Sequence, residues 1–223
     1  MHVTAIIAAA GAGRRLGAAK PKQLLDIGGG SMLQHSVRAF LGHPRVADVV
    51  VVVSPDLTTL ALAGIEPSRA AALRVVKGGD RRQDSVANGF AAVAPESDVV
   101  LIHDAARPFV SADLIDRTID AAAAHGAAIA ALQSRDTVKR VAGDGRITET
   151  IPRETIYLAQ TPQGFRREVL VKAHAAAEGS DATDDVTLVE AIGGHVVAVP
   201  GDERAFKVTV PLDLALAEVL LDG

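Results

Sequence analysis

The stretch VTAIIAAAGAGRRLGAAKPKQ, residues 3–23, decides the fold. It starts with an apolar run, Val3 to Ile7, which three alanines and a glycine follow at once. Such a run next to a glycine is typical of a strand buried on both faces of a parallel sheet. The loop behind it therefore opens at the carboxyl end of a strand, where ligands of parallel sheets bind.

This first loop combines glycines with positive charge. Glycine lets a ligand approach the main chain closely, so that several backbone N–H groups can point at one anion. The glycines are Gly11, Gly13 and Gly17, and the cations are Arg14, Arg15, Lys20 and Lys22. We interpret the loop as a polyphosphate site; the alternative is a surface turn with solvated arginines.

The two common phosphate motifs do not fit the first loop. A P-loop needs a Lys-Ser or Lys-Thr pair after its last glycine, but alanines follow Gly17. In the dinucleotide motif the third glycine comes one place earlier, and no arginines fill the interval. Basic side chains here suit another task, which is to offset charge that builds up on phosphorus during a transfer reaction.

The overall composition narrows the class of protein. A chain of 223 residues, 48% of them hydrophobic, predicts a single domain over residues 1–223. The net charge of −4 argues against nucleic-acid and membrane binding. There is no cysteine, which excludes disulfides and thiol nucleophiles and fits a cytoplasmic protein. We find neither a signal sequence nor an apolar run of the roughly 20 residues that a membrane span needs.

Predicted strands and helices alternate along the chain. This order predicts an α/β, Rossmann-like fold with a mainly parallel sheet and helices on both faces. The expected strands are 3–7, 46–53, 73–76, 99–102, 127–132 and 195–199, and the expected helices are about 31–41, 83–93, 111–125, 166–177, 184–191 and 211 to the end. The first loop, Gly78–Arg82 and His103–Pro108 all follow strands, so we expect one shared crevice.

The alternation breaks between residues 135 and 157. Thr137–Val141 and Ile147–Ile151 flank a turn rich in glycine and aspartate, which predicts a β-hairpin. We interpret it as a projecting arm that packs on another subunit. The residues after Tyr157–Gln160, Thr161-Pro162-Gln163-Gly164, are interpreted as a turn.

Asp104 is the first chemical candidate, because it follows a buried strand in the sequence H-D-A-A-R-P. One carboxylate together with substrate phosphates is a common way to hold Mg²⁺. The alternative is a turn aspartate that bonds its own backbone. Arg107 could pair with Asp104 or reach a phosphate, and we expect His103 to pack or hydrogen-bond rather than act as a base.

Two other groups have both a functional and a structural interpretation. Gly79, Asp80 and Ser85 could recognise a nucleobase edge, or could simply form a loop and a helix start. Asp184 and Asp185 are interpreted as helix-start charges, and Lys207 taken alone as a solvated lysine.

Taken together, these segments resemble one family. A-A-A-G-x-G-x-R-x-G with P-K-Q, G-G-x-x-R-x-x-S-V, H-D-A-A-R-P, R-D-T-x-K, T-P-Q-x-F, T-D-D and F-K-V-T occur in this order from Val3 to the last helix. The set closely resembles the 2-C-methyl-D-erythritol 4-phosphate cytidylyltransferases of the non-mevalonate isoprenoid pathway. The resemblance implies transfer of CMP from CTP to the sugar phosphate, release of pyrophosphate, and a need for Mg²⁺.

The resemblance also assigns roles by motif. It implies that Arg15 and Lys22 stabilise the transferring phosphorus, that Asp104 lies at the metal, and that the arm is exchanged across a homodimer. The implied nucleotide-binding residues are Ala9, Ala10, Gly11, Gly13, Gly79, Asp80 and Ser85, and the implied substrate-binding residues are Thr137, Arg153, Thr161, Lys207 and Arg107.

Three other functions remain open at this point. A ribitol 5-phosphate cytidylyltransferase would carry very similar motifs. A nicotinamide-dependent dehydrogenase is disfavoured by the late third glycine and by Ser54-Pro55, which stand where an acidic residue is expected. A non-catalytic nucleotide sensor would leave Arg15 and Lys22 without a purpose.

Overall fold

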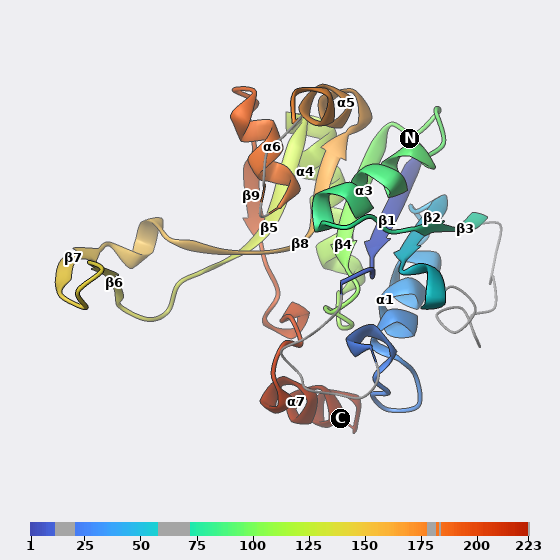
Figure 1. Cartoon of the computed structure of the whole chain (residues 1–223). Helices are drawn as coiled ribbons and strands as arrows, with labels where there is room; N and C mark the ends of the chain where they lie inside the picture. Colours follow the sequence, from blue (N-terminus) through green and yellow to red (C-terminus); the bar gives the residue numbers. More distant parts are fainter. Residues whose placement is uncertain (12–20, 58–71, 178–181, 183, 223) are drawn as a thin grey trace.

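A computed structural model describes residues 1–11, 21–57, 72–177, 182 and 184–222. Within them, seven strands form one twisted sheet in the order β3-β2-β1-β4-β8-β5-β9 (Figure 1). All neighbouring pairs are parallel except those of β8, which runs antiparallel to β4 and β5. The strands are β1 (Val3–Ala8), β2 (Asp48–Val53), β3 (Ala72–Lys77), β4 (Val99–Asp104), β5 (Ala127–Gln133), β8 (Tyr157–Arg166) and β9 (Val197–Pro200).

Helices cover both faces of the sheet, so the predicted α/β class is confirmed. On one face α1 (Met32–Leu41) and α4 (Ala112–His125) enclose a core with Val49 and Val51. On the other, Val50 and Val52 point into a core under α3 (Arg82–Ala91), α5 (Arg167–Ala176) and α6 (Asp185–Ala191). Alternate residues of β2 thus serve opposite cores, which explains its unbroken run of valines.

The remaining described helical elements are one further α-helix and short 3₁₀ turns. The last helix, α7 (Pro211–Asp222), packs its Ala217 in a small core with Ile27, Met32 and Val208. The described 3₁₀ turns between the larger elements are η2 (Lys22–Leu24), η3 (Pro55–Leu57), η4 (Arg153–Thr155) and η5 (Glu203–Ala205). No helix among these described residues is both long and apolar enough to cross a bilayer.

The helix starts follow the capping residues of the sequence. The Ser31 hydroxyl accepts from the Gln34 amide at 3.2 Å, and the Gln34 side chain accepts from the Ser31 amide at 2.7 Å. This reciprocal pair satisfies two amides that the first turn of a helix leaves free. In α4 and α6 the cap is a single bond: the side chain of Ser111 accepts from the Leu114 amide, and that of Asp184 accepts from the Thr187 amide.

The predicted turn at Thr161–Gly164 is wrong, because these residues lie inside β8 in the middle of the sheet. A Cβ on Gly164 would lie 2.9 Å from the Cβ of Ala122 in α4, so glycine is needed here for close packing of the helix on the strand. Gln163 also makes a long-range contact, since its side-chain oxygen accepts a hydrogen bond from the amide of Asp185 at 3.1 Å. Local turn residues therefore serve long-range contacts.

The hairpin predicted between residues 135 and 157 is present. β6 (Val138–Val141) and β7 (Ile147–Ile151) pair antiparallel, and Gly145 takes a positive φ of 84° in the turn between them. Figure 1 shows the pair at the end of an arm that stands away from the main sheet. The far end of β8 leads directly into this arm.

Candidate active site

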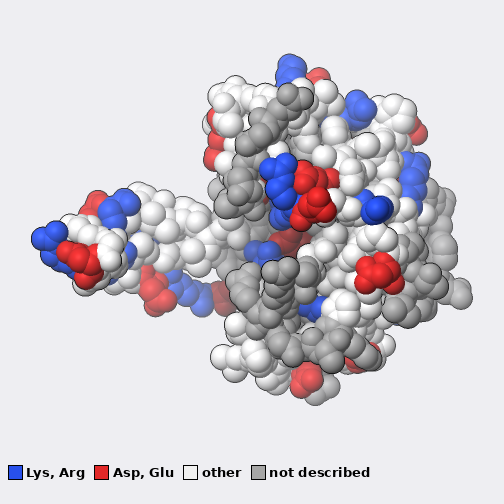
Figure 2. All heavy atoms as spheres, in the orientation of Figure 1, with Lys and Arg blue, Asp and Glu red and all other residues white. Residues whose placement is uncertain are grey.

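The loops after β1, β3 and β4 meet at one end of the sheet. The backbone hydrogen bonds of the sheet extend into these loops. The Ala105 amide donates to the Ala8 carbonyl at 3.1 Å, and the Gly78 amide donates to the Val53 carbonyl at 2.7 Å. A cavity of about 340 Å³ opens between these loops. In the space-filling view, charged side chains of both signs gather at the middle of this face (Figure 2).

Most predicted site residues line this cavity. They are Ala9, Ala10, Gly11, Lys22, Gly79, Asp80, Ser85, Asp104 and Lys207. The sequence predicted that the three loops after strands would meet here, and the structure adds the segment that carries Lys207. The predicted residues Gly13 and Arg15 lie outside the described residues.

The glycine pair after β3 allows two loops to touch. A Cβ on Gly78 would lie 2.3 Å from the Cβ of Ala10, a distance that forces one loop to move. The buried Ser85 hydroxyl accepts from the Gly79 amide at 3.1 Å and donates to the Arg81 carbonyl at 3.0 Å. The backbone of this loop is therefore held against the first loop at the cavity wall.

Asp104 is the electrostatic centre of the cavity. Its Oδ2 lies 2.6 Å from Nζ of Lys207, and its Oδ1 lies 3.5 Å from Nε of Arg82. Burial alone would raise the pKa of Asp104, but the charge of Lys207 and then that of Arg82 outweigh it and hold the pKa well below its usual range. The carboxylate is thus ionised at neutral pH, with a cation on either side.

Arg82 is a cavity residue to which the sequence analysis gave no role. Its Nη1 lies 2.7 Å from Oδ2 of Asp185, whose side chain is 1% exposed. Burial raises the pKa of Asp185, and the charge of Arg82 partly offsets that effect. A signal was present, because Arg82 is the arginine of the quoted G-G-x-x-R motif. Gln23, buried in η2 at the cavity wall, was also missed, although it is the glutamine of the quoted P-K-Q motif.

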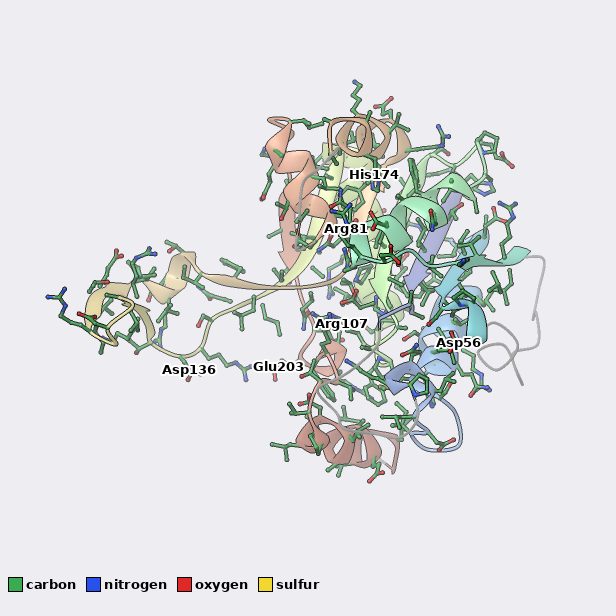
Figure 3. The ribbon with its side chains drawn as sticks, viewed as in Figure 1. Asp56, Arg81, Arg107, Asp136, His174 and Glu203 are labelled. Carbon is green, nitrogen blue, oxygen red and sulfur yellow. The ribbon has the colours of Figure 1, made fainter. Side chains whose placement is uncertain are left out.

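Two predicted substrate-binding residues lie behind the cavity rather than in its lining. The buried Arg107 guanidinium donates to the carbonyls of Ala205, at 2.8 Å, and Ala159, at 3.2 Å. It lies between the sheet and the segment that leads to α7 (Figure 3). The buried Thr161 hydroxyl is engaged by the Asp104 amide at 3.1 Å and by His103 Nδ1 at 3.0 Å. Both residues support the site from inside the protein.

His103 is fully buried next to Asp104. Burial lowers its pKa to about 4, although the Arg107 carbonyl and the charge of Asp104 act in the other direction. Its ring packs against Phe40, with centroids 4.9 Å apart. The prediction that His103 packs and hydrogen-bonds is confirmed.

Thr137 and Arg153 lie on the arm and are exposed. Arg153 donates from Nη1 to the Arg135 carbonyl at 2.9 Å, and 55% of its side chain is exposed. Neither residue lines the cavity of its own chain. A role for them in substrate binding therefore stays a prediction.

The described residues allow a simple test of the Mg²⁺ prediction. They contain no group of three or more acidic or histidine side chains that would form a complete metal cage. Asp104 does supply one ionised carboxylate at the cavity wall. A single carboxylate with phosphate oxygens as the remaining ligands suits Mg²⁺, so Asp104 fits the group.

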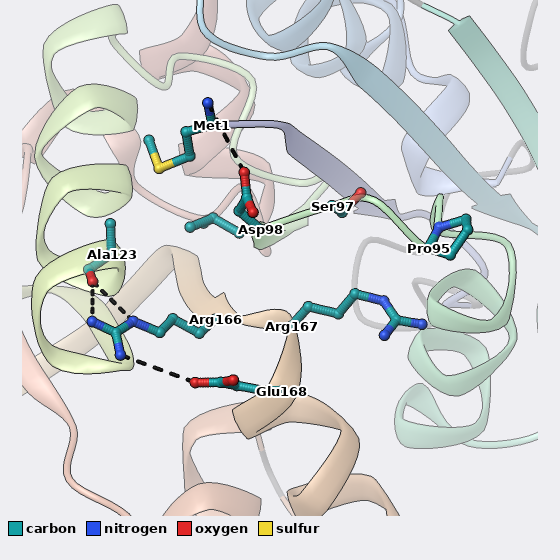
Figure 4. Close-up of a pocket in the computed structure, with 9 residues that line it drawn as sticks. Met1, Pro95, Ser97, Asp98, Ala123, Arg166, Arg167 and Glu168 are labelled. Carbon is teal, nitrogen blue, oxygen red and sulfur yellow. Dashed lines mark hydrogen bonds and ion pairs between the residues drawn. The ribbon is translucent and has the colours of Figure 1, made fainter.

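A second hollow lies at the other end of the strands, near the start of β1 (Figure 4). Its Arg166 donates from Nε to the Ala123 carbonyl at 2.9 Å and lies 4.0 Å from Glu168. The amino group of Met1 lies 3.9 Å from Asp98. We place the active site in the first cavity, because the loops at the carboxyl ends of the strands line it.

Comparison with known proteins gives one consistent family. The sequence profile described as "IspD: 2-C-methyl-D-erythritol 4-phosphate cytidylyltransferase" matches residues 3–223. A protein of that name from Syntrophus aciditrophicus is 42% identical, over 98% of this chain and 95% of its own length. The bifunctional enzyme IspD/IspF of Anaeromyxobacter dehalogenans is 48% identical, but this chain spans only 58% of it.

The fold agrees with solved structures of the same family. The crystal structure of 2-C-methyl-D-erythritol 4-phosphate cytidylyltransferase from Thermus thermophilus superposes with a TM-score of 0.81 and 39% identity, over 100% of both chains.

Proposed function

This chain belongs to the IspD family of 2-C-methyl-D-erythritol 4-phosphate cytidylyltransferases, and on that premise we propose that it transfers CMP from CTP to 2-C-methyl-D-erythritol 4-phosphate. The products are 4-diphosphocytidyl-2-C-methyl-D-erythritol and pyrophosphate, in isoprenoid precursor synthesis. One observation carries the proposal: Lys22, Asp104 and Lys207 line the same cavity as the backbone of Gly11 and Gly79. A glycine backbone with cations suits a polyphosphate.

The reaction needs positioning and charge rather than a protein base. An oxygen of the sugar phosphate, already ionised at neutral pH, attacks the α-phosphorus of CTP. The new O–P bond forms as the bond to the pyrophosphate oxygen breaks, and pyrophosphate leaves with those electrons. Lys22 at the cavity wall offsets the charge that grows on the phosphorus oxygens, with Arg15 expected to share this role. The neutral, buried His103 is not required for proton transfer.

Asp104 is the residue that would hold Mg²⁺, which supplies positive charge to the phosphate oxygens when it is bound. Lys207 and Arg82 set the direction of this carboxylate, because they contact its two oxygens separately. Gly79, Asp80 and Ser85 would bind the cytidine part of the substrate. Their loop lies close to Ala10 because Gly78 has no side chain.

The proposal includes a homodimer in which the arm reaches a neighbouring site, and a cytoplasmic location. Support for the shared site comes from the arm itself, which carries Thr137 and Arg153 away from the cavity of its own chain (Figure 1). Exposed apolar side chains on the arm, Val141 at 55% and Ile147 at 60%, are suited to a protein contact.

Pyrophosphate release tests the function directly. The protein is incubated with CTP and Mg²⁺, and with 2-C-methyl-D-erythritol 4-phosphate, ribitol 5-phosphate or no acceptor. We expect rapid release of pyrophosphate only when 2-C-methyl-D-erythritol 4-phosphate is the acceptor. Faster release with ribitol 5-phosphate would assign the alternative acceptor, and no release above the acceptor-free rate would refute a cytidylyltransferase.

A further inference from the structure

The contacts of His103 form a continuous path from the loop carbonyl of Arg107 to the backbone of Asp104. His103 Nε2 lies 3.0 Å from the Arg107 carbonyl oxygen, and Nδ1 lies 3.0 Å from the Thr161 hydroxyl. The same hydroxyl accepts from the Asp104 amide at 3.1 Å. All of these groups are buried.

The directions of these hydrogen bonds follow from elementary chemistry. A carbonyl oxygen only accepts, so His103 must donate to Arg107 from Nε2. A neutral ring has a single N–H, which leaves Nδ1 as an acceptor. The Thr161 hydroxyl must then donate to His103 Nδ1, and one of its lone pairs accepts from the Asp104 amide. Every donor and acceptor on this path is satisfied with one arrangement of hydrogens.

The same loop also holds the segment that carries Lys207. Arg107 donates from its guanidinium to the Ala205 carbonyl, and the Val208 amide donates to the Ala106 carbonyl at 2.9 Å. These two bonds flank Lys207 in the sequence. The loop that fixes the ring of His103 therefore fixes both partners of the Asp104–Lys207 ion pair.

We propose that His103 and Thr161 are positioning residues for the transfer reaction: the Nε2–H form of His103 orients the Thr161 hydroxyl, which holds the backbone of Asp104 and so aims its carboxylate at the cavity. Neither residue lines the cavity. This inference rests on the proposed function, and it replaces the expectation that Thr161 binds the sugar phosphate, since its hydroxyl is already used.

The test compares two buried threonines. Thr161→Val removes the hydroxyl of the path, and Thr161→Ser keeps it. Thr118→Val is the matched control, because Thr118 is also fully buried and its hydroxyl donates to the Leu114 carbonyl in α4 at 2.8 Å. We expect both valine variants to fold with a lowered Tm. Only Thr161→Val should lose kcat, by roughly 10- to 100-fold as for a misplaced reacting group, with KM for CTP changed less than kcat. Thr161→Ser, which keeps the hydroxyl, should have most of the wild-type kcat.

Nitrogen NMR of histidine-labelled protein gives a readout that does not depend on turnover. The His103 signals are assigned by their loss in His103→Asn, and we expect a protonated Nε2 and a bare Nδ1 whose shift changes in Thr161→Val. A protonated Nδ1, or an unchanged kcat in a folded Thr161→Val protein, would overturn the proposal. If the wild type releases no pyrophosphate, the proposed function fails. The NMR signals of His103 then still show which ring nitrogen carries the proton, and so whether the hydrogen-bond path through Thr161 exists.

Discussion

Nζ of Lys207 lies 2.6 Å from Oδ2 of Asp104, although 103 residues separate them in the sequence. The bond joins the segment before α7 to the end of β4, and it is one of two cationic contacts on the same carboxylate. Lys207 and Asp104 both line the cavity, so this pair links the packing of the carboxyl-terminal segment to the charge of the site.

Replacement of Lys207 should make the protein more sensitive to acid. A carboxylate with a lowered folded pKa adds stability that is full above the unfolded pKa of about 4 and is lost as the pH falls through the folded value. We expect Lys207→Met to raise the folded pKa of Asp104 and to move the acid-unfolding midpoint, followed by circular dichroism, to a higher pH. Lys207→Arg keeps the charge and should stay close to the wild type. An unchanged midpoint in Lys207→Met would show that Arg82 alone neutralises Asp104.

Removal of Arg82 should destabilise the fold, because it leaves the buried Asp185 carboxylate without its cation. Breaking one side of a buried ion pair typically costs about 3–5 kcal/mol, and the partial exposure of Arg82 favours the lower end. The raised folded pKa of Asp185 means that its contribution is full below about pH 4 and is lost as the pH rises. The loss in Arg82→Gln should therefore be largest at neutral pH.

Urea unfolding of four proteins measures this coupling: the wild type, Arg82→Gln, Asp185→Asn and the double variant. We expect the double variant to recover most of the stability that Arg82→Gln loses, because no charge is then left unpaired at Asp185. Simple additivity of the two single losses would contradict a direct pairing.

Lys22→Ala should lose catalysis far more than nucleotide binding. Removal of one preorganised contact to developing charge typically costs about 3–4 kcal/mol, or 10²–10³ in kcat. Steady-state kinetics and CTP titration separate the two quantities. Lys172→Ala, on the exposed face of α5, is the control for loss of a lysine charge and should behave as the wild type. A Lys22→Ala enzyme with normal kcat would remove Lys22 from the transfer step.

Arg153→Ala should raise KM for the sugar phosphate, because it removes ground-state binding from the neighbouring arm. In a mixture with Lys22→Ala protein, subunit exchange should regenerate some competent sites, each built from one intact arm and one intact cavity. Arg146→Ala, an exposed arginine in the turn of the same hairpin, should leave KM unchanged. If activity does not recover in a mixture shown to exchange subunits, the arm does not serve the partner's site.

The sequence predicts the sheet well where burial is uniform. β1, β2 and β4 are mainly apolar and are covered on both faces, so their positions can be predicted from composition. β8 is the exception, because Pro162 and Gly164 are typical turn residues. The use of Thr161, Gln163 and Gly164 in a strand depends on partners that no local pattern contains, namely the Asp104 amide, α6 and α4.

The site was predictable in its location but not in its ion pairs. Strand ends locate Gly11, Gly79 and Asp104 at one edge of the sheet. Lys207 alone looks like a solvated lysine, and only the folded chain shows that its ammonium group neutralises Asp104. Arg107 shows the opposite case, since its position in H-D-A-A-R-P suggests a ligand contact while its guanidinium binds two carbonyls.

β8 connects the arm to the centre of the active site through one continuous stretch of backbone. One end of this strand is hydrogen-bonded between β4 and β5, and the other continues into the arm. Thr161, at mid-strand, holds the backbone of Asp104. In the proposed dimer, a neighbour that binds the arm would therefore be joined, by one stretch of backbone, to the residue that holds Asp104.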